Sequence, residues 1–195
     1  MKKRWLITLL FLISFISIYY TDFNLNNLTG MVIQPKISNP VTSMVEDTGN
    51  IQVFFCPQDK CDQALVNFIA SAKKSIHCAL FEINLQPIKD ILDKKSTEID
   101  TKIVIDNNYI KKYNRSFVKV DTWSLMHNKF CIVDDVKIST GSMNPTPNGA
   151  FKNNNNLLLI YSPVLASNYE DEFQEMWNGT FKKGNKVLNP KIKIG

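Results

Sequence analysis

Between about residues 46 and 180, the chain alternates short apolar runs of strand length with longer stretches where apolar residues recur every three or four positions. The short runs predict strands and the longer stretches predict helices. Strands are expected at residues 51–56, 75–83, 101–106, 117–121 and 156–162, with a hairpin over 127–140, and helices at 60–74, 85–92 (capped by Asn84) and 163–177. This alternation predicts an α/β domain with helices on both faces of a β-sheet, which is mixed because of the hairpin.

Residues 1–20 follow another pattern, with three basic residues before sixteen largely apolar ones. At 1.5 Å per residue the apolar run spans about 24 Å as a helix, against about 30 Å for a bilayer core. We predict a single-pass membrane anchor, with the basic end in the cytoplasm and the domain on the extracytoplasmic side. A cleaved signal peptide, which would leave a secreted protein, is the alternative, although no small-residue cleavage site follows the apolar run.

The segments flanking the domain are polar. Residues 21–45 are rich in Asn, Thr and Ser and predict a linker, which leaves residues 46–180 as one domain. Residues 181–195 predict a basic tail, either solvated or in contact with phosphates or lipid head groups. Its lysines are Lys182, Lys183, Lys186, Lys191 and Lys193. The net charge is +5, but three positive charges precede the apolar run, so charge is a weak argument for nucleic acid.

The stretch from His127 to Asn144 carries the candidate chemistry. Attack on a phosphodiester spreads negative charge over oxygens, which an ammonium, an amide and a hydroxyl stabilise. An imidazole, with a reference pKa of roughly 6.5, can attack phosphorus, and its conjugate acid can protonate the leaving alkoxide. Strand alternation would put His127 and Lys129 on one face. The polar residues of this stretch are His127, Lys129, Asp134, Ser142 and Asn144, with Gly141 before the serine.

The spacing H-x-K-x4-D-x6-G-S-x-N resembles the signature of the phospholipase D superfamily. With one copy of the motif, the chain is similar to the branch that holds phospholipase D-like endonucleases and mitochondrial cardiolipin hydrolase. The resemblance covers about residues 46–180 and implies the phospholipase D-like fold. It also implies hydrolysis of phospholipid or nucleic-acid phosphodiesters through a phosphohistidine, without metal or cofactor. The alternative is a non-catalytic, membrane-tethered protein that binds phosphate-bearing polymers or lipids.

A second imidazole is needed across the phosphate, because attack and protonation occur on opposite sides of an in-line displacement. The chain has two histidines, and His77 lies in an apolar run that predicts a packed, hydrogen-bonded core residue. We therefore expect the second imidazole to be His127 of another copy, in a homodimer with a two-fold axis through the site. The resemblance implies the same arrangement.

The remaining roles follow from the motif. Lys129 and Asn144 are expected to bind the phosphate, with help from Ser142. Asp134 belongs to the motif, but its strand parity and the following turn predict a structural role. Family members often carry a glutamate fourteen residues after the motif glycine, where this chain has Asn155. The Asn155 carbonyl could orient the imidazole without supplying charge, and Glu82 is a weaker substitute.

The four cysteines do not predict a disulfide framework. Cys56 and Cys61 could pair in an oxidising exterior, whereas Cys78 and Cys131 are expected to be buried strand residues. A zinc site is disfavoured, because no clear second pair of ligands accompanies Cys56 and Cys61.

Overall fold

The computed structural model describes residues 44–195 except Ser124. These residues belong to one compact unit of the chain. The predicted membrane segment and nearly all of the predicted linker lie outside them. Within the described part, no helix is both long and apolar enough to cross a bilayer.

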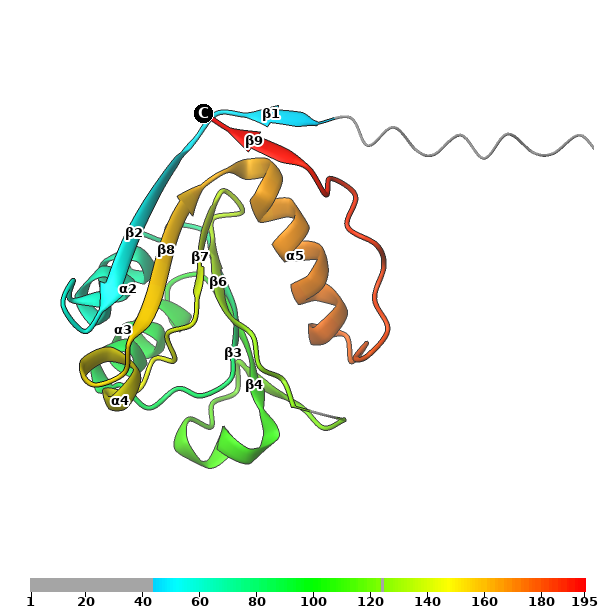
Figure 1. The fold of residues 1–195 in the computed structure, drawn as a ribbon. Helices are drawn as coiled ribbons and strands as arrows, with labels where there is room; N and C mark the ends of the chain where they lie inside the picture. Colours follow the sequence, from blue (N-terminus) through cyan, green and yellow to red (C-terminus); the bar gives the residue numbers. More distant parts are fainter. Residues whose placement is uncertain (1–43, 124) are drawn as a thin grey trace, which may run out of the picture. The chain divides into compact units, whose positions relative to one another are not determined.

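A seven-stranded mixed sheet forms the centre of the domain, in the order β2-β8-β7-β6-β3-β4-β5 (Figure 1). Strands β3, β4 and β5 are parallel, and β6, β7, β8 and β2 continue from β3 with antiparallel pairing. The strands are β2 (Asn50–Cys56), β3 (Ser75–Leu80), β4 (Asp100–Asp106), β5 (Val118–Asp121), β6 (Lys129–Val133), β7 (Lys137–Gly141) and β8 (Asn155–Tyr161). The predicted mixed sheet is confirmed.

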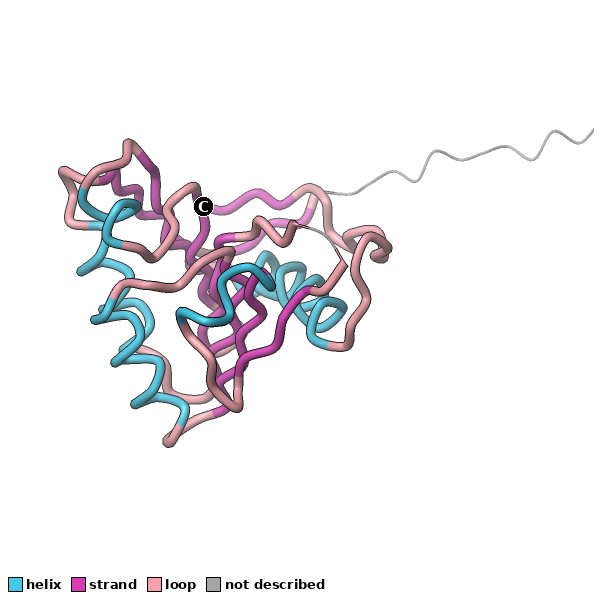
Figure 2. Tube along the Cα trace, turned by 90° about the horizontal axis from the view of Figure 1, so that it is seen from below, coloured by secondary structure: helices cyan, strands magenta, loops and turns pink. Residues whose placement is uncertain are grey.

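Helices lie on both faces of this sheet, as predicted (Figure 2). Helices α2 (Cys61–Ala70) and α3 (Gln86–Ser96) pack on one face, and α5 (Pro163–Trp177) packs on the other. Strand alternation separates two cores, with Cys78 and Leu80 of β3 towards α2 and α3, and Ala79 towards α5. The short helices η1 (Asn107–Lys112) and α4 (Pro147–Phe151) lie in the loops that follow β4 and β7.

The predicted start of α3 was wrong by one residue, because the helix begins at Gln86. Leu85 occupies the cap position without a side-chain bond, and Pro87 lies in the first turn. Asn84 does not cap the helix; its Oδ1 accepts a hydrogen bond from Lys89 Nζ at 3.1 Å. By contrast, α5 begins at Pro163 as predicted, and the Ser162 hydroxyl accepts from the Leu165 N–H at 3.1 Å.

All four cysteines form disulfides, which corrects the expectation that they form no framework. Cys56 bonds to Cys61, the pairing that the sequence allowed, with Cα atoms 5.6 Å apart. Cys78 also bonds to Cys131, with Cα atoms 4.1 Å apart. These two residues face each other on the antiparallel strands β3 and β6. The second bond therefore joins the middle strand of the sheet, β6, covalently to its neighbour β3.

The predicted basic tail is only partly a tail. Its lysines are exposed, as expected for solvated charges. Residues Ile192–Ile194, however, form β9, which pairs in parallel with β1 (Val45–Asp47). Strand β1 also begins inside the predicted linker, so the domain extends further in both directions than residues 46–180.

Candidate active site

The residues of the motif cluster at one end of the sheet because of its antiparallel topology. Strand β6 begins with Lys129, the neighbouring β7 ends at Gly141, and the next strand, β8, begins at Asn155. In antiparallel neighbours, the start of one strand lies beside the end of the next. Residues separated by up to about thirty positions in the chain are thereby brought to one end of the sheet.

His127 lies in the loop before β6, not in the strand as predicted, because β6 begins only at Lys129. Its side chain is exposed, and the ring meets Phe81 edge-on with the centroids 4.8 Å apart. Among the described residues, no hydrogen bond to the His127 ring is present. The imidazole is thus held by packing while both ring nitrogens remain available to a ligand.

Lys129 lies directly beside this loop. Its Nζ donates to the His127 carbonyl oxygen at 2.8 Å and lies 5.2 Å from the centre of the Phe81 ring. Partial burial lowers the pKa of Lys129 below the usual lysine value. An ammonium in this partly desolvated position gains more from an incoming phosphate than one in bulk water.

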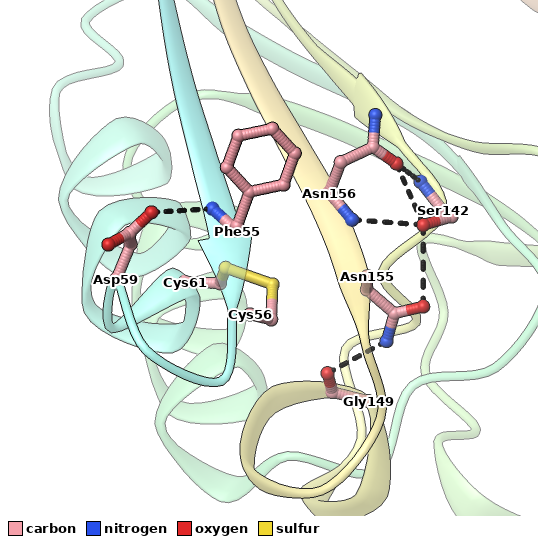
Figure 3. Close-up of a disulfide and its surroundings, with 8 residues drawn as sticks. All are labelled: Phe55, Cys56, Asp59, Cys61, Ser142, Gly149, Asn155 and Asn156. Carbon is pink, nitrogen blue, oxygen red and sulfur yellow. Dashed lines mark hydrogen bonds between the residues drawn. A yellow bond between two sulfur atoms is a disulfide. The ribbon is translucent and has the colours of Figure 1, made fainter.

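Ser142 is fixed by two asparagines at the start of β8 (Figure 3). Its hydroxyl lies 2.8 Å from Asn156 Oδ1 and 3.3 Å from Asn155 Oδ1. Its backbone N–H donates to the Asn156 carbonyl oxygen at 3.0 Å. Gly141 permits this close approach, because a Cβ there would lie 2.3 Å from that same oxygen and its φ is +140°. Asn156 was missed from the sequence, where it is one of a run of identical residues.

Asn155 does not orient His127 in the structure, contrary to the expectation. Its Nδ2 donates to the Gly149 carbonyl oxygen at 2.9 Å, and its Oδ1 faces the Ser142 hydroxyl (Figure 3). Glu82 does not replace it, because its carboxylate pairs with Lys112 at 2.5 Å. Asn155 therefore positions Ser142, and the described residues supply no carboxylate to the His127 ring.

Asn144 follows β7 and is half-buried. Its backbone oxygen accepts from the Thr146 N–H at 2.7 Å, whereas its buried Oδ1 has no hydrogen-bond partner among the described residues. An amide presents an acceptor on one side and two donors on the other, so rotation can direct its donors outwards. Asn144 consequently keeps hydrogen-bonding capacity for a ligand.

Asp134 lies at the far end of β6, on the predicted hairpin turn, with a φ of +56°. Its carboxylate accepts from the backbone N–H groups of Lys73 at 2.9 Å, Lys74 at 2.7 Å and Ser75 at 3.2 Å. Burial alone would raise the pKa of Asp134, but these N–H groups outweigh it and lower the pKa. Asp134 thus anchors the loop that leads into β3 and does not meet His127.

His77 is buried on the face covered by α5 and stacks on Phe173, with ring centroids 4.9 Å apart. Its Nδ1 lies 2.8 Å from Glu170 Oε1, and its Nε2 lies 3.2 Å from Asp100 Oδ2. Burial alone would lower the pKa of His77, but the hydrogen bond and charge of Glu170 raise it. The prediction of a packed, hydrogen-bonded histidine is confirmed, and His77 is not a second imidazole for the His127 site.

A groove of about 690 Å³ opens beside His127 and Lys129. Helix α5 forms one wall, through Leu165, Asn168 and Tyr169, and the segment that leads into β9 forms another. Residues 187–194 therefore contribute to this site, although the sequence predicted only a tail there.

Comparison with known protein families agrees with the resemblance that the His127–Asn144 motif shows. A family model described as "Cardiolipin synthase, PLD-like domain" matches residues 65–177, more than half of the chain. The chain therefore belongs to the phospholipase D superfamily.

Two similar proteins have names from this superfamily. A mitochondrial cardiolipin hydrolase from Chlamydomonas reinhardtii is 25% identical over 124 residues, covering 58% of this chain and 56% of that protein. A phospholipase D from Rickettsia prowazekii is 26% identical over 131 residues, covering 62% of this chain and 64% of that protein. The chain thus spans less than two thirds of the length of these relatives.

Solved structures share the fold. The phospholipase D family member Nuc from Salmonella typhimurium superimposes with a TM-score of 0.60 at 25% identity, covering 70% of this chain and 99% of that one. NucT from Helicobacter pylori superimposes with a TM-score of 0.58 at 20% identity, covering 67% of this chain and 97% of that one. Nearly the whole of each of these two chains therefore has a counterpart in this chain.

Proposed function

We propose that this protein is a phosphodiesterase of the phospholipase D type that forms a covalent phosphohistidine at His127. The observation that carries the proposal is an exposed imidazole, free of hydrogen bonds within the described residues, beside the Lys129 ammonium at one end of the sheet. Mere binding of phosphate does not require an imidazole in this place. Membership of the superfamily and the names of the relatives support the same activity.

The reaction would proceed by double displacement. A ring nitrogen of His127 attacks phosphorus and the ester bond to the leaving alkoxide breaks, while a second imidazolium gives that alkoxide its proton. Water then attacks phosphorus and breaks the P–N bond, and the second imidazole, now neutral, takes the proton of the water. Lys129 and Asn144 would stabilise the phosphoryl oxygens, with Ser142 held in place by Asn155 and Asn156. This chemistry draws on no metal.

The second imidazole in this scheme is the partner subunit's His127, in a two-fold dimer. The other described histidine, His77, is engaged by Glu170 and Asp100. A surface that suits a second copy lies along the edge strand β2, where Ile51, Val53 and Phe55 are 50%, 52% and 61% exposed. Phe55 is paired with Asn156, so this apolar stripe reaches the active end of the sheet (Figure 3).

We propose a phospholipid as the substrate. Trp123 and Leu125, shortly before His127, are 68% and 62% exposed, and Lys182 Nζ lies 5.6 Å from the centre of the Trp123 ring. Aromatic and aliphatic side chains next to lysines suit a bilayer interface with anionic head groups. A membrane anchor in residues 1–20 would hold the site near that surface, and two disulfides suit an extracytoplasmic compartment.

The experiment compares substrates with the full-length protein. Vesicles of phosphatidylcholine, vesicles that contain cardiolipin, and single- and double-stranded DNA are incubated with the protein in EDTA. We expect phospholipid hydrolysis, and a loss of about 10⁴-fold or more in the His127→Asn variant. Wild-type protein quenched with labelled substrate should carry an acid-labile phosphoryl group that the variant lacks.

Each outcome decides a different part of the proposal. Cleavage of DNA but not of lipid would make the protein a nuclease and refute the substrate assignment. Binding without turnover, unchanged in His127→Asn, would identify the non-catalytic binder. Equal melting temperatures of the two proteins would show that the loss of turnover is not a loss of folding.

A further inference from the structure

A cluster of three side chains that could each bind a metal ion lies near the ends of β3 and β6 that are remote from His127. It comprises His77 from β3, Glu170 from α5 and Asp135 from the turn between β6 and β7. One ligand atom from each lies within 4.8 Å of the others. We propose that these three residues bind a divalent transition-metal cation, Zn²⁺ foremost, as a structural site.

The hydrogen bonds around His77 match those of a metal-ligating histidine. Its Nδ1 faces Glu170, at 2.8 Å from Oε1 and 3.0 Å from Oε2, while its Nε2 faces Asp100 Oδ2 at 3.2 Å. Histidine ligands typically give their other ring N–H to a carboxylate, which fixes the tautomer and raises the basicity of the ligating nitrogen. Asp100 would have that role here. Gln174 Nε2 also donates to Glu170 Oε1 at 2.6 Å, which orients the second ligand.

The charge of the cluster also suits a dication. Three carboxylates surround His77, those of Asp100, Asp135 and Glu170. The Lys102 ammonium pairs with the Asp100 carboxylate at 2.6 Å and balances one of these three charges. With His77 in its neutral form, which a metal-ligating imidazole must have, two negative charges would remain around it. A protonated His77 would account for Glu170 and Asp100 as partners, whereas a bound cation would also engage the Asp135 carboxylate.

Asp135 is brought to the cluster by the shape of the turn. Asp134 and Asp135 both have positive φ, +56° and +59°. The carboxylate of Asp134 binds the backbone of the loop before β3, whereas that of Asp135 lies with His77 and Glu170. Imidazole nitrogen and carboxylate oxygen are both zinc ligands, and water would complete a tetrahedron at the exposed side, where Asp135 lies.

Such an ion would join a strand, a turn and a helix that are far apart in the sequence. Glu170 follows Asn168 and Tyr169 of α5, which line the groove beside His127. The five residues of β6 separate the two ends of the sheet by roughly 16 Å, so the ion would not touch the reacting phosphate. Its effect would be to hold one wall of the groove against the sheet.

The test uses full-length protein freed of metal by a chelator and then dialysed. Zn²⁺ is titrated by calorimetry, and Co²⁺ is added as an absorption probe of the coordination geometry. We expect one ion per chain, a tetrahedral Co²⁺ spectrum and a higher melting temperature with Zn²⁺. Asp135→Asn should weaken binding at least about tenfold, and Asp100→Asn about 10- to 100-fold. Asparagine also tolerates the positive φ at position 135, so that variant is expected to fold.

Asp171→Asn is the matched control, because it removes an exposed carboxylate next to Glu170 in the same helix. Its affinity for Zn²⁺ should equal that of the wild type. Failure to bind Zn²⁺ in a saturable way, or equal affinities of the Asp135→Asn and Asp171→Asn variants, would overturn the proposal. The His127→Asn variant should bind the ion normally, so the result is independent of the proposed hydrolase activity.

Discussion

Replacing Asp134 by asparagine tests whether this motif residue stabilises the fold. The variant keeps the size of the side chain and the tolerance for a φ of +56°, but it loses the charge. Three backbone N–H groups, those of Lys73, Lys74 and Ser75, would then donate to a neutral oxygen. The substitution thus isolates the contribution of the carboxylate charge to these bonds.

The expected loss of stability follows from the number of bonds. A hydrogen bond to a charged group contributes about 1.5 to 3 kcal/mol net, and a neutral one about half as much. Because the three bonds share one acceptor group and are partly exposed, they do not add fully, and we expect a loss of about 2 kcal/mol. That corresponds to a melting temperature lower by about 4 to 8 °C for a domain of this size.

The assay is urea unfolding of both proteins at pH 7 and at a series of lower pH values. The pKa of Asp134 is lowered in the folded state, so its contribution is present above the ordinary carboxyl pKa near 3.9 and is lost as the pH falls through the folded-state pKa. The stability gap between wild type and variant should therefore close below about pH 4. Asp171→Asn, at an exposed position, should leave stability at pH 7 unchanged. An unaltered midpoint for Asp134→Asn at pH 7, or a gap that persists in acid, would refute this reasoning.

Two further predictions concern the active site. Lys129→Met should lower kcat for the phosphodiester by about 10²- to 10³-fold, measured by steady-state kinetics, because one cation that stabilises the transition state is lost. A change in KM alone would show that Lys129 acts only in binding. When wild type and His127→Asn are co-expressed in equal amounts and pair randomly, the mixture should retain about one quarter of the activity per chain, because both imidazoles of a dimer are needed. Retention of one half would show that each subunit works alone.

The sequence predicted the architecture well because the apolar pattern is strong where the chain is buried. Strand β3 is buried along its whole length, and α5 has the predicted bounds because Ser162 and Pro163 define its start. Strands β1 and β9 were missed, since three residues are too few to show a period. The pairing of Cys78 with Cys131 depends on which strands are neighbours and in which register, and spacing along the chain contains neither.

Within the candidate site, spacing located the residues but not the directions of their side chains. Counting from Gly141 reached Asn155, yet only the structure shows that its amide faces Ser142 and Gly149. The histidine loop was assigned to a strand because alternation continues through His127, although pairing stops at Lys129. The partners of His77 lie 23 and 93 residues away, beyond the reach of any local pattern.

The disulfide between Cys78 and Cys131 crosses the seam of the sheet, where three parallel strands meet four antiparallel ones. It closes a loop of 53 residues, which in the chain-entropy treatment disfavours the unfolded state by about 4 kcal/mol. Thiol reductants would break this disulfide and remove its stabilisation of the fold. The loss would fall where the parallel strands meet the antiparallel strands, and the antiparallel part carries Lys129 and Ser142. Purification buffers for this protein should accordingly omit dithiothreitol, and a thiol titration should precede any assay.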